Sequence, residues 1–161
     1  MSVSTPMTKE GFEKLKAQLQ QLKGVERHKV SKAIEEARGH GDLSENAEYD
    51  SAKQKQGIME ARIAQLEHKI ASAQVIDPAA IQDDKITFGA TVTVLNVDTD
   101  EERTYMIVGE DEADLKTGKI SVLSPLARAL IGKKEKDLVE FEAPGGRREL
   151  EIIKFVYRAN T

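Results

Sequence analysis

Two acidic residues, Asp42 and Glu45, stand three positions apart in the segment GDLSENAEY at residues 41–49. Carboxylate oxygens are the ligands that a hard cation such as Mg²⁺ prefers, and one or two carboxylates often hold such an ion while water and phosphate fill its other positions. Two carboxylates do not make a tight site by themselves. They can complete a site on another molecule, where a phosphoryl-transfer centre would gain a second metal ion and an oriented water.

The same spacing also has a purely structural interpretation. An acidic cap followed three residues later by Glu is the capping-box pattern at the start of a helix, and that pattern needs no further function. Three features favour the metal interpretation: glycines precede the acidic pair, the segment lies between two long helical patterns, and only Leu43 and Tyr49 in it are large and apolar. Both interpretations stay open at this point.

The remaining polar side chains near the acidic pair have weaker functional signals. Arg38, Lys53 and Lys55 flank the segment and form a candidate phosphate-contacting patch, although charges on a coiled coil are usually only solvated. No general base accompanies Ser44, so a catalytic triad is not indicated.

Three further residues of the segment are expected to support it. Ser44 and Asn46 are interpreted as caps of the second helix, and Tyr49 as the last residue of its apolar stripe.

Composition narrows the class of protein. The chain has 161 residues, a formal net charge of −4, no cysteine and three histidines. The absence of cysteine excludes disulfides and thiolate metal sites, and the histidines form no spaced cluster. The negative charge argues against a protein that binds nucleic acid mainly by neutralising phosphates. No apolar run approaches the roughly 20 residues of a membrane span and no signal peptide is evident, so a cytoplasmic location is expected.

Apolar or small residues recur at alternating spacings of three and four on both sides of the acidic segment. The first run is Phe12, Leu15, Leu19 and Leu22, and it resumes at Val30, Ile34 and Ala37. The second run is Tyr49, Ala52, Met59, Ile63, Leu66, Ile70 and Ala73, with Gln56 as its only polar member. This spacing predicts a coiled-coil seam, with a change of phase near Val25 and Glu26 that locally unwinds the supercoil. Glycines at 39 and 41 stop the first helix, so an antiparallel hairpin with arms of about 45 Å is expected.

After the hairpin the pattern changes to the alternation of strands. Strands are predicted at 91–97, 104–108, 120–123, 138–141 and 150–157, with a short helix capped by Ser124 and a hairpin turn at 144–146. The predicted fold class is α+β: an antiparallel helical hairpin followed by a small antiparallel sheet with one short helix. The predicted domains are 1–76 with an acidic tip at 39–46, a linker at 77–85, and 86–161.

Four segments in this order resemble the bacterial Gre transcript-cleavage factors, most closely their A type. They are ARGHGDLSENAEY at 37–49, FGATVTV at 88–94, IVGEDEAD at 107–114 and SPLARALIG at 124–132. The resemblance covers essentially the whole chain. It implies that the second domain has an FKBP-like fold and docks on the β′ subunit of RNA polymerase at the entrance of the secondary channel, while the coiled coil enters that channel.

The resemblance also implies roles for individual residues. Asp42 and Glu45 would stabilise the second Mg²⁺ and the attacking water at the active centre of a backtracked polymerase, beside the 3′ end of the nascent RNA. Docking would involve Asp111, Glu112, Asp114, Ser124 and Pro125, although Leu123 stands where some relatives have a polar residue. The chain would be a monomeric accessory factor without a cofactor of its own, and the polymerase would be the enzyme.

Two alternatives accompany this interpretation. An inhibitory Gre-like relative would bind the same channel without promoting cleavage, and the limited acidity of the tip, with Glu48 a turn beyond it, favours an activator. A coiled-coil adaptor or holdase, from a different class, would grip its partners along the arm and would not need Asp42 or Glu45.

Overall fold

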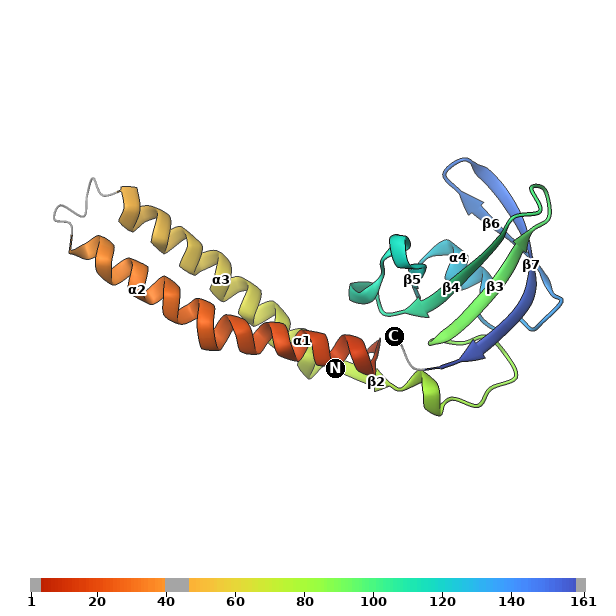
Figure 1. The fold of residues 1–161 in the computed structure, drawn as a ribbon, viewed down its shortest axis with the longest axis horizontal. Helices are drawn as coiled ribbons and strands as arrows, with labels where there is room; N and C mark the ends of the chain where they lie inside the picture. Colours follow the sequence, from red (N-terminus) through yellow and green to blue (C-terminus); the bar gives the residue numbers. More distant parts are fainter. Residues whose placement is uncertain (1–3, 40–46, 159–161) are drawn as a thin grey trace. The chain divides into compact units, whose positions relative to one another are not determined.

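The computed structural model describes residues 4–39 and 47–158, and these form two compact units (Figure 1). The arm unit comprises residues 13–72, and the sheet unit comprises residues 4–12 together with 73–158. Residues 4–12, which the sequence assigned to the helical domain, therefore belong to the same unit as the sheet. Helix α1 (Lys9–Gln21) begins in the sheet unit and continues into the arm unit.

The arm unit is the predicted helical hairpin. Helix α1 passes through a π-helical turn, η1 (Leu22–Glu26), into α2 (Arg27–Arg38), and α3 (Ala47–Ala71) packs beside them (Figure 1). The predicted seam is confirmed, because its members are the buried side chains of the hairpin: Leu15, Ile34, Ala37, Ala52, Met59, Ile63 and Leu66. Gly39 ends α2, and its N–H donates to the carbonyl oxygens of Glu36 and Glu35 at 3.1 and 3.3 Å.

The π-helical turn lies where the sequence predicts a change of phase. One extra residue in a helical turn rotates the following apolar positions, and Val25 within η1 is accordingly 40% exposed. Directly after the turn, the guanidinium of Arg27 donates to both carboxylate oxygens of Glu60 on α3, at 2.9 and 2.7 Å. This ion pair holds α2 and α3 together at the point where the seam resumes.

The sheet unit contains a five-stranded sheet in the order β5-β4-β3-β7-β6. Its strands are β3 (Ala90–Asn96), β4 (Glu102–Val108), β5 (Lys119–Ser121), β6 (Leu138–Ala143) and β7 (Gly146–Tyr157). The predicted short helix is α4 (Pro125–Leu130), where the hydroxyl of Ser124 accepts a hydrogen bond from the N–H of Ala127 at 3.2 Å. Fully buried side chains from β3, β4, β7 and α4 form its core, among them Val92, Ile107, Leu130 and Ile152.

One strand departs from the antiparallel arrangement that the sequence predicted. Strand β5 pairs with β4 in parallel, while β3–β4, β3–β7 and β6–β7 are antiparallel. The parallel pairing is possible because the connection carries two 3-10 turns, η4 (Glu110–Glu112) and η5 (Leu115–Thr117), which return the chain to the middle of β4, where Lys119 lies opposite Met106. Gly118 completes the return in the left-handed conformation, and a Cβ there would lie 2.9 Å from the carbonyl oxygen of Thr104.

A second, two-stranded sheet was not predicted. Strand β1 (Thr5–Thr8) pairs in parallel with β2 (Ala73–Ile76), so the residues before α1 lie beside those after α3. The predicted linker at 77–85 begins with η3 (Pro78–Ala80), where the Asp77 carboxylate accepts from the N–H of Ala79 at 3.0 Å. Pro78 is buried.

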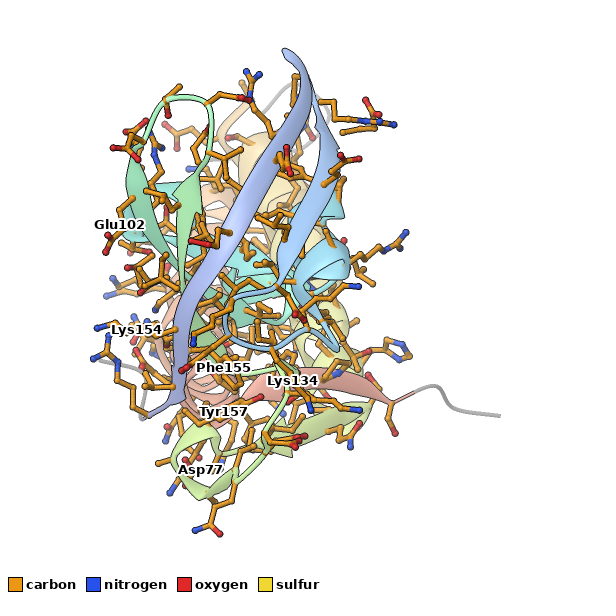
Figure 2. All side chains as sticks on the ribbon, turned by 90° about the vertical axis from the view of Figure 1, so that its right-hand side faces the viewer. Asp77, Glu102, Lys134, Lys154, Phe155 and Tyr157 are labelled. Carbon is orange, nitrogen blue, oxygen red and sulfur yellow. The ribbon has the colours of Figure 1, made fainter. Side chains whose placement is uncertain are left out.

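The end of this linker is tied to β7 (Figure 2). The hydroxyl of Tyr157 donates to the carbonyl oxygen of Lys85 at 2.5 Å and accepts from the N–H of Thr87 at 2.9 Å. Figure 2 shows Phe155 and Tyr157 close together on β7, and their rings meet edge to face with centroids 6.1 Å apart. The segment that leads into the sheet is therefore fixed by hydrogen bonds to that sheet.

Candidate functional site

The acidic pair that the sequence singled out lies outside the described residues. Asp42, Ser44, Glu45 and Asn46 all fall in the segment 40–46, so the structure gives no geometry for them. Their flanks are described. Helix α2 ends at Arg38 and α3 begins at Ala47, and these two helix ends lie at the same end of the hairpin (Figure 1).

Small side chains line the hairpin next to these helix ends. A cavity of about 430 Å³ lies between α2 and α3, where Ala33 and Ala37 face Ala47, Ser51 and Ala52. Alanine and serine fill little of the space between two helices, so this end of the arm is incompletely packed.

Charged residues surround this small-residue end. Arg38 is the exposed last residue of α2, Lys55 lines the cavity, and Lys53 is exposed with its amine 3.1 Å from the Oε1 atom of Gln56. The three predicted phosphate-contacting residues thus lie near the same end of the hairpin: Arg38 ends α2, and Lys53 and Lys55 lie within the first three turns of α3. Tyr49 is half-buried in its predicted seam position.

Two carboxylates, Glu36 and Glu48, also line this cavity, and the sequence analysis assigned no functional role to Glu36. Its position directly before the seam residue Ala37 could have indicated that it lies at the edge of the seam.

The residues predicted to dock on a partner follow two neighbouring strands. Asp111 and Glu112 belong to η4 after β4, and Ser124 and Pro125 follow β5. Because β4 and β5 are parallel, both segments leave the same end of the strand pair, and the N–H of Val122 donates to the carbonyl oxygen of Val108 at 2.8 Å. The topology therefore brings these two predicted segments to one edge of the sheet unit.

Several of these side chains are already engaged within the protein. The Ser124 hydroxyl donates to the carbonyl oxygen of Ser121 at 2.7 Å in addition to capping α4. The Asp114 carboxylate accepts from the N–H of Lys116 at 3.1 Å, and Asp114 pairs with Lys119 at the opposite end of β5 from Ser124. Asp114 therefore lies in a turn at the other end of β5 from Ser124 and Pro125, the residues with which it was predicted to dock.

Exposed apolar groups accompany the docking segments. Leu123 is 53% exposed beside Ser124, and Pro125 is exposed at the start of α4. A groove of about 350 Å³ extends from Pro125 along Ala129 to Phe141 on β6, with Arg147 bridging Glu140 and Glu142 at 3.4 and 3.5 Å. Leu123 does not line this groove, but it adds exposed apolar surface next to Ser124 and Pro125.

A larger hollow on the sheet was missed by sequence reasoning. It has a volume of about 450 Å³, its base is formed by Val94 and Leu150, and Tyr105, Phe141 and Arg148 line it. Alternation along each strand was the signal that could have placed the half-buried aromatic residues on one face.

Surface ion pairs shift the pKa values of their own members in each unit. The hydrogen bond from Arg27 lowers the pKa of the Glu60 carboxyl below its ordinary value, and the same bond raises the pKa of Arg27. In the described ranges 4–39 and 47–158, no group of three or more His, Asp or Glu residues is arranged to hold a metal ion. The same ranges contain no helix that is both long and apolar enough to cross a membrane.

Comparison with known proteins bears on both units. The model of the transcription elongation factor N-terminal domain, GreA_GreB_N, matches residues 5–75, and that of the GreA/GreB C-terminal domain matches residues 81–157. The transcription elongation factor GreA of Hyphomonas neptunium is 59% identical over 95% of this chain and 98% of its own length. The GreA protein of Neisseria meningitidis serogroup A is 58% identical over 94% of this chain and 97% of its own length.

A solved structure of the transcription factor Gfh1 is 27% identical, with a TM-score of 0.46 over 96% of this chain and 99% of that one. The regions aligned with these two GreA proteins cover 95% and 94% of this chain, and the two domain models match residues 5–75 and 81–157. With both domain models matched in order along one chain, this protein belongs to the GreA/GreB family of transcription elongation factors.

Proposed function

We propose that this protein stimulates the cleavage of nascent RNA by a backtracked bacterial RNA polymerase. The observation that carries the proposal is the match of both domains to the GreA/GreB family, with GreA relatives that are 59% and 58% identical along almost the whole chain. In this proposal the end of the arm that bears residues 40–46 enters the secondary channel. The small side chains that flank this segment support entry into a narrow space.

The acidic pair would act at the polymerase's own active centre. Asp42 and Glu45 offer only hard oxygen donors, which fit Mg²⁺, and two carboxylates are too few for a tight resident site. When bound there, Mg²⁺ supplies charge at the scissile phosphate and lowers the pKa of an attacking water. Asp42 and Glu45 would orient that water, while Arg38, Lys53 and Lys55 would contact RNA phosphates.

The product of this reaction is a new RNA 3′ end in register with the active centre. Water attacks the phosphodiester bond, the 3′-terminal fragment leaves, and the shortened transcript can be extended again. The protein supplies positioning and charge, and the polymerase supplies the catalytic site. It is in this sense an accessory factor that works in the cytoplasm as a single copy on the polymerase.

Docking would be the task of the sheet unit. Leu123 and Pro125 present exposed apolar surface at one edge, next to the groove that leads to Phe141. An apolar surface of this kind buries well against a partner protein, and the exposed Asp111 beside it can meet basic residues. We assign the contact with the β′ subunit to this edge.

The test is the cleavage of end-labelled RNA in stalled, backtracked elongation complexes with Mg²⁺. The double variant Asp42→Ala, Glu45→Ala is expected to lose stimulated cleavage by at least about 100-fold, because the groups that orient water at the metal are gone. Binding to polymerase should change little, since docking energy comes from the other unit. Asp50→Ala is the matched control, because it removes an exposed carboxylate from the first turn of α3.

The outcomes separate the possible functions. Cleavage with the wild type and the Asp50 variant, but not with the double variant, supports the proposal. Binding without cleavage by the wild type would point to an inhibitor of the same channel. Absence of binding to polymerase would favour a coiled-coil adaptor.

A further inference from the structure

The carboxylate of Glu112 forms three hydrogen bonds inside the sheet unit. Its Oε2 atom accepts from the N–H of Thr8 at 2.9 Å and from the N–H of Gly109 at 3.0 Å. Its Oε1 atom accepts from the hydroxyl of Thr8. Both oxygens are thus occupied by residues of the same unit, although Thr8 and Glu112 are 104 positions apart in the chain.

Thr8 is the N-cap of helix α1. Its side chain is fully buried, and its Oγ1 atom accepts from the N–H of Gly11 at 3.1 Å. In an ordinary capping box, a Glu or Gln three residues after the cap would return a hydrogen bond to the N–H of the cap residue. That position here is Gly11, and the carboxylate that receives the N–H of Thr8 comes from Glu112. The sheet unit therefore completes the capping box of α1 in place of a residue of the helix.

Two glycines leave the space that this carboxylate occupies. A Cβ at Gly11 would lie 2.3 Å from the Cδ atom of Glu112. A Cβ at Gly109 would lie 2.7 Å from the carbonyl oxygen of Pro6 and 2.9 Å from the Oε2 atom of Glu112. The φ angle of Gly109 is −68°, which any residue adopts, so space and not backbone conformation requires glycine there. We call Thr8, Gly11, Gly109 and Glu112 together the Glu112 clamp.

The position of the clamp in the chain gives it a mechanical consequence. Helix α1 begins inside the sheet unit and continues as the first helix of the arm. An uncapped helix frays in its first turn, because its first N–H groups lack partners. Fraying at residues 9–12 would disorder the first turn of the helix that continues into the arm. The clamp gives the N–H groups of Thr8 and Gly11 partners, and it also places negative charge at the positive end of the helix.

We propose that Glu112 is a positioning residue for transcript cleavage: by capping α1 from a distant part of the chain, it keeps ordered the first turn of the helix that continues into the arm. This inference rests on the function proposed above. It gives Glu112 a different role from Glu110, which belongs to the same acidic run but is exposed and, among the described residues, takes part in no side-chain hydrogen bond or ion pair. If the whole acidic run served docking, substitutions of Glu110 and Glu112 would have similar effects on binding to polymerase.

The test uses four variants of the full chain. Glu112→Asp keeps the charge but is one methylene too short for the clamp, and Thr8→Val removes the hydroxyl from the other side with little change of shape. Thr8→Ser keeps the hydroxyl and is the conservative rescue. Glu110→Gln is the matched control for the charge of the acidic run.

Three quantities are measured for each variant: RNA cleavage at saturating factor, binding to polymerase by competition with labelled wild type, and hydrogen exchange of the amides at residues 8–12. We expect Glu112→Asp and Thr8→Val to lower the saturated cleavage rate about tenfold, since a displacement of about 1 Å at a reacting centre costs that much or more. Their binding should change less than about twofold, while exchange at Thr8 and Gly11 rises about tenfold, as expected for loss of a cap. Thr8→Ser and Glu110→Gln should behave as the wild type.

Other results would overturn the inference. Unchanged cleavage despite faster exchange would make the clamp a cap for stability alone. A loss of binding equal to the loss of cleavage, or an equal effect of Glu110→Gln, would assign Glu112 to docking. If the wild type stimulates no cleavage, the proposed function fails and this inference fails with it, whereas cleavage by wild type and clamp variants alike removes this inference only.

Discussion

The arm unit and the sheet unit bury their apolar side chains in different ways. In the sheet unit, side chains from three strands and α4 surround one another, so that Val92, Ile107, Leu130 and Ile152 are all fully buried. In the arm, a single seam carries the burial, and it thins from Met59, Ile63 and Leu66 to Ala37 and Ala52 next to residues 40–46. The comparison teaches that the sheet unit is stabilised by an enclosed core, whereas the far end of the arm has little buried apolar surface to hold its helices together.

The difference follows from geometry. A side chain in a two-helix seam meets neighbours on one partner helix, and the opposite face of each helix stays in water. A side chain between a sheet and a helix meets neighbours on all sides, and interiors of this kind are close-packed. The arm therefore depends on a few large residues near its root, and two helices alone are marginal beyond them.

The largest effect on the arm is expected from a charge in its seam. Ile63 is 2% exposed, and Ile63→Asp would bury a carboxylate with no partner at a cost of about 3 kcal/mol or more. Helical circular dichroism on heating should show the arm melting at a much lower temperature, while the sheet unit keeps its own transition. Ala61→Asp, on the exposed face of the same helix, is the control, and equal melting of the two variants would mean that the seam is misplaced.

The same truncation in both units measures their difference directly. Ile63→Ala and Ile152→Ala each delete a buried side chain, and both should lower the free energy of unfolding by about 2–5 kcal/mol. We expect the cost to be larger for Ile152 by about 1 kcal/mol, because the enclosed core collapses less easily around a cavity than an open seam does. Denaturant unfolding followed separately for helix and sheet would test this. A larger cost in the arm would contradict the comparison.

The smallest effect is expected from the ion pair between Arg27 and Glu60 in the middle of the arm. Because Arg27 lowers the pKa of Glu60 in the folded arm, the pair stabilises the arm above the ordinary carboxyl pKa of 4.5, and this contribution is lost as pH falls through the lowered value. Both side chains are exposed, so the change should be small. The melting temperature of wild type and Glu60→Gln should converge at low pH, and a constant difference between them down to acidic pH would exclude this origin.

Much of the fold could be predicted because it is written in local patterns. The spacing of Met59, Ile63 and Leu66 predicted the seam, and the phase change near Val25 predicted the place of η1. Ser124 followed by Pro125 predicted α4, which begins at Pro125 with the Ser124 hydroxyl as its cap. Each of these signals involves residues within a few positions of one another, where helix geometry alone sets the contacts.

Pairings between distant segments could not be predicted in this way. Strand β5 has three residues, too few for a pattern that distinguishes parallel from antiparallel pairing. Strands β1 and β2 are short and pair residues that are 68 positions apart, such as Thr5 and Ala73. Their partners are selected by which edges lie free after the larger elements have packed. For the candidate site, the sequence named Asp42 and Glu45, and their geometry lies outside the described residues.

The acidic run at 110–114 shows most clearly where sequence stops and tertiary structure begins. The sequence by itself determined the chemistry of this protein: two carboxylates between long helices, a seam to hold those helices, and a family match in both domains. It presented Asp111, Glu112 and Asp114 as equivalent acids. Only the tertiary structure distinguished them, because the role of a carboxylate depends on the hydrogen-bond donors that lie near it in space. Of these three acids, Glu112 accepts hydrogen bonds from the N–H and the hydroxyl of Thr8, which is 104 positions away in the chain.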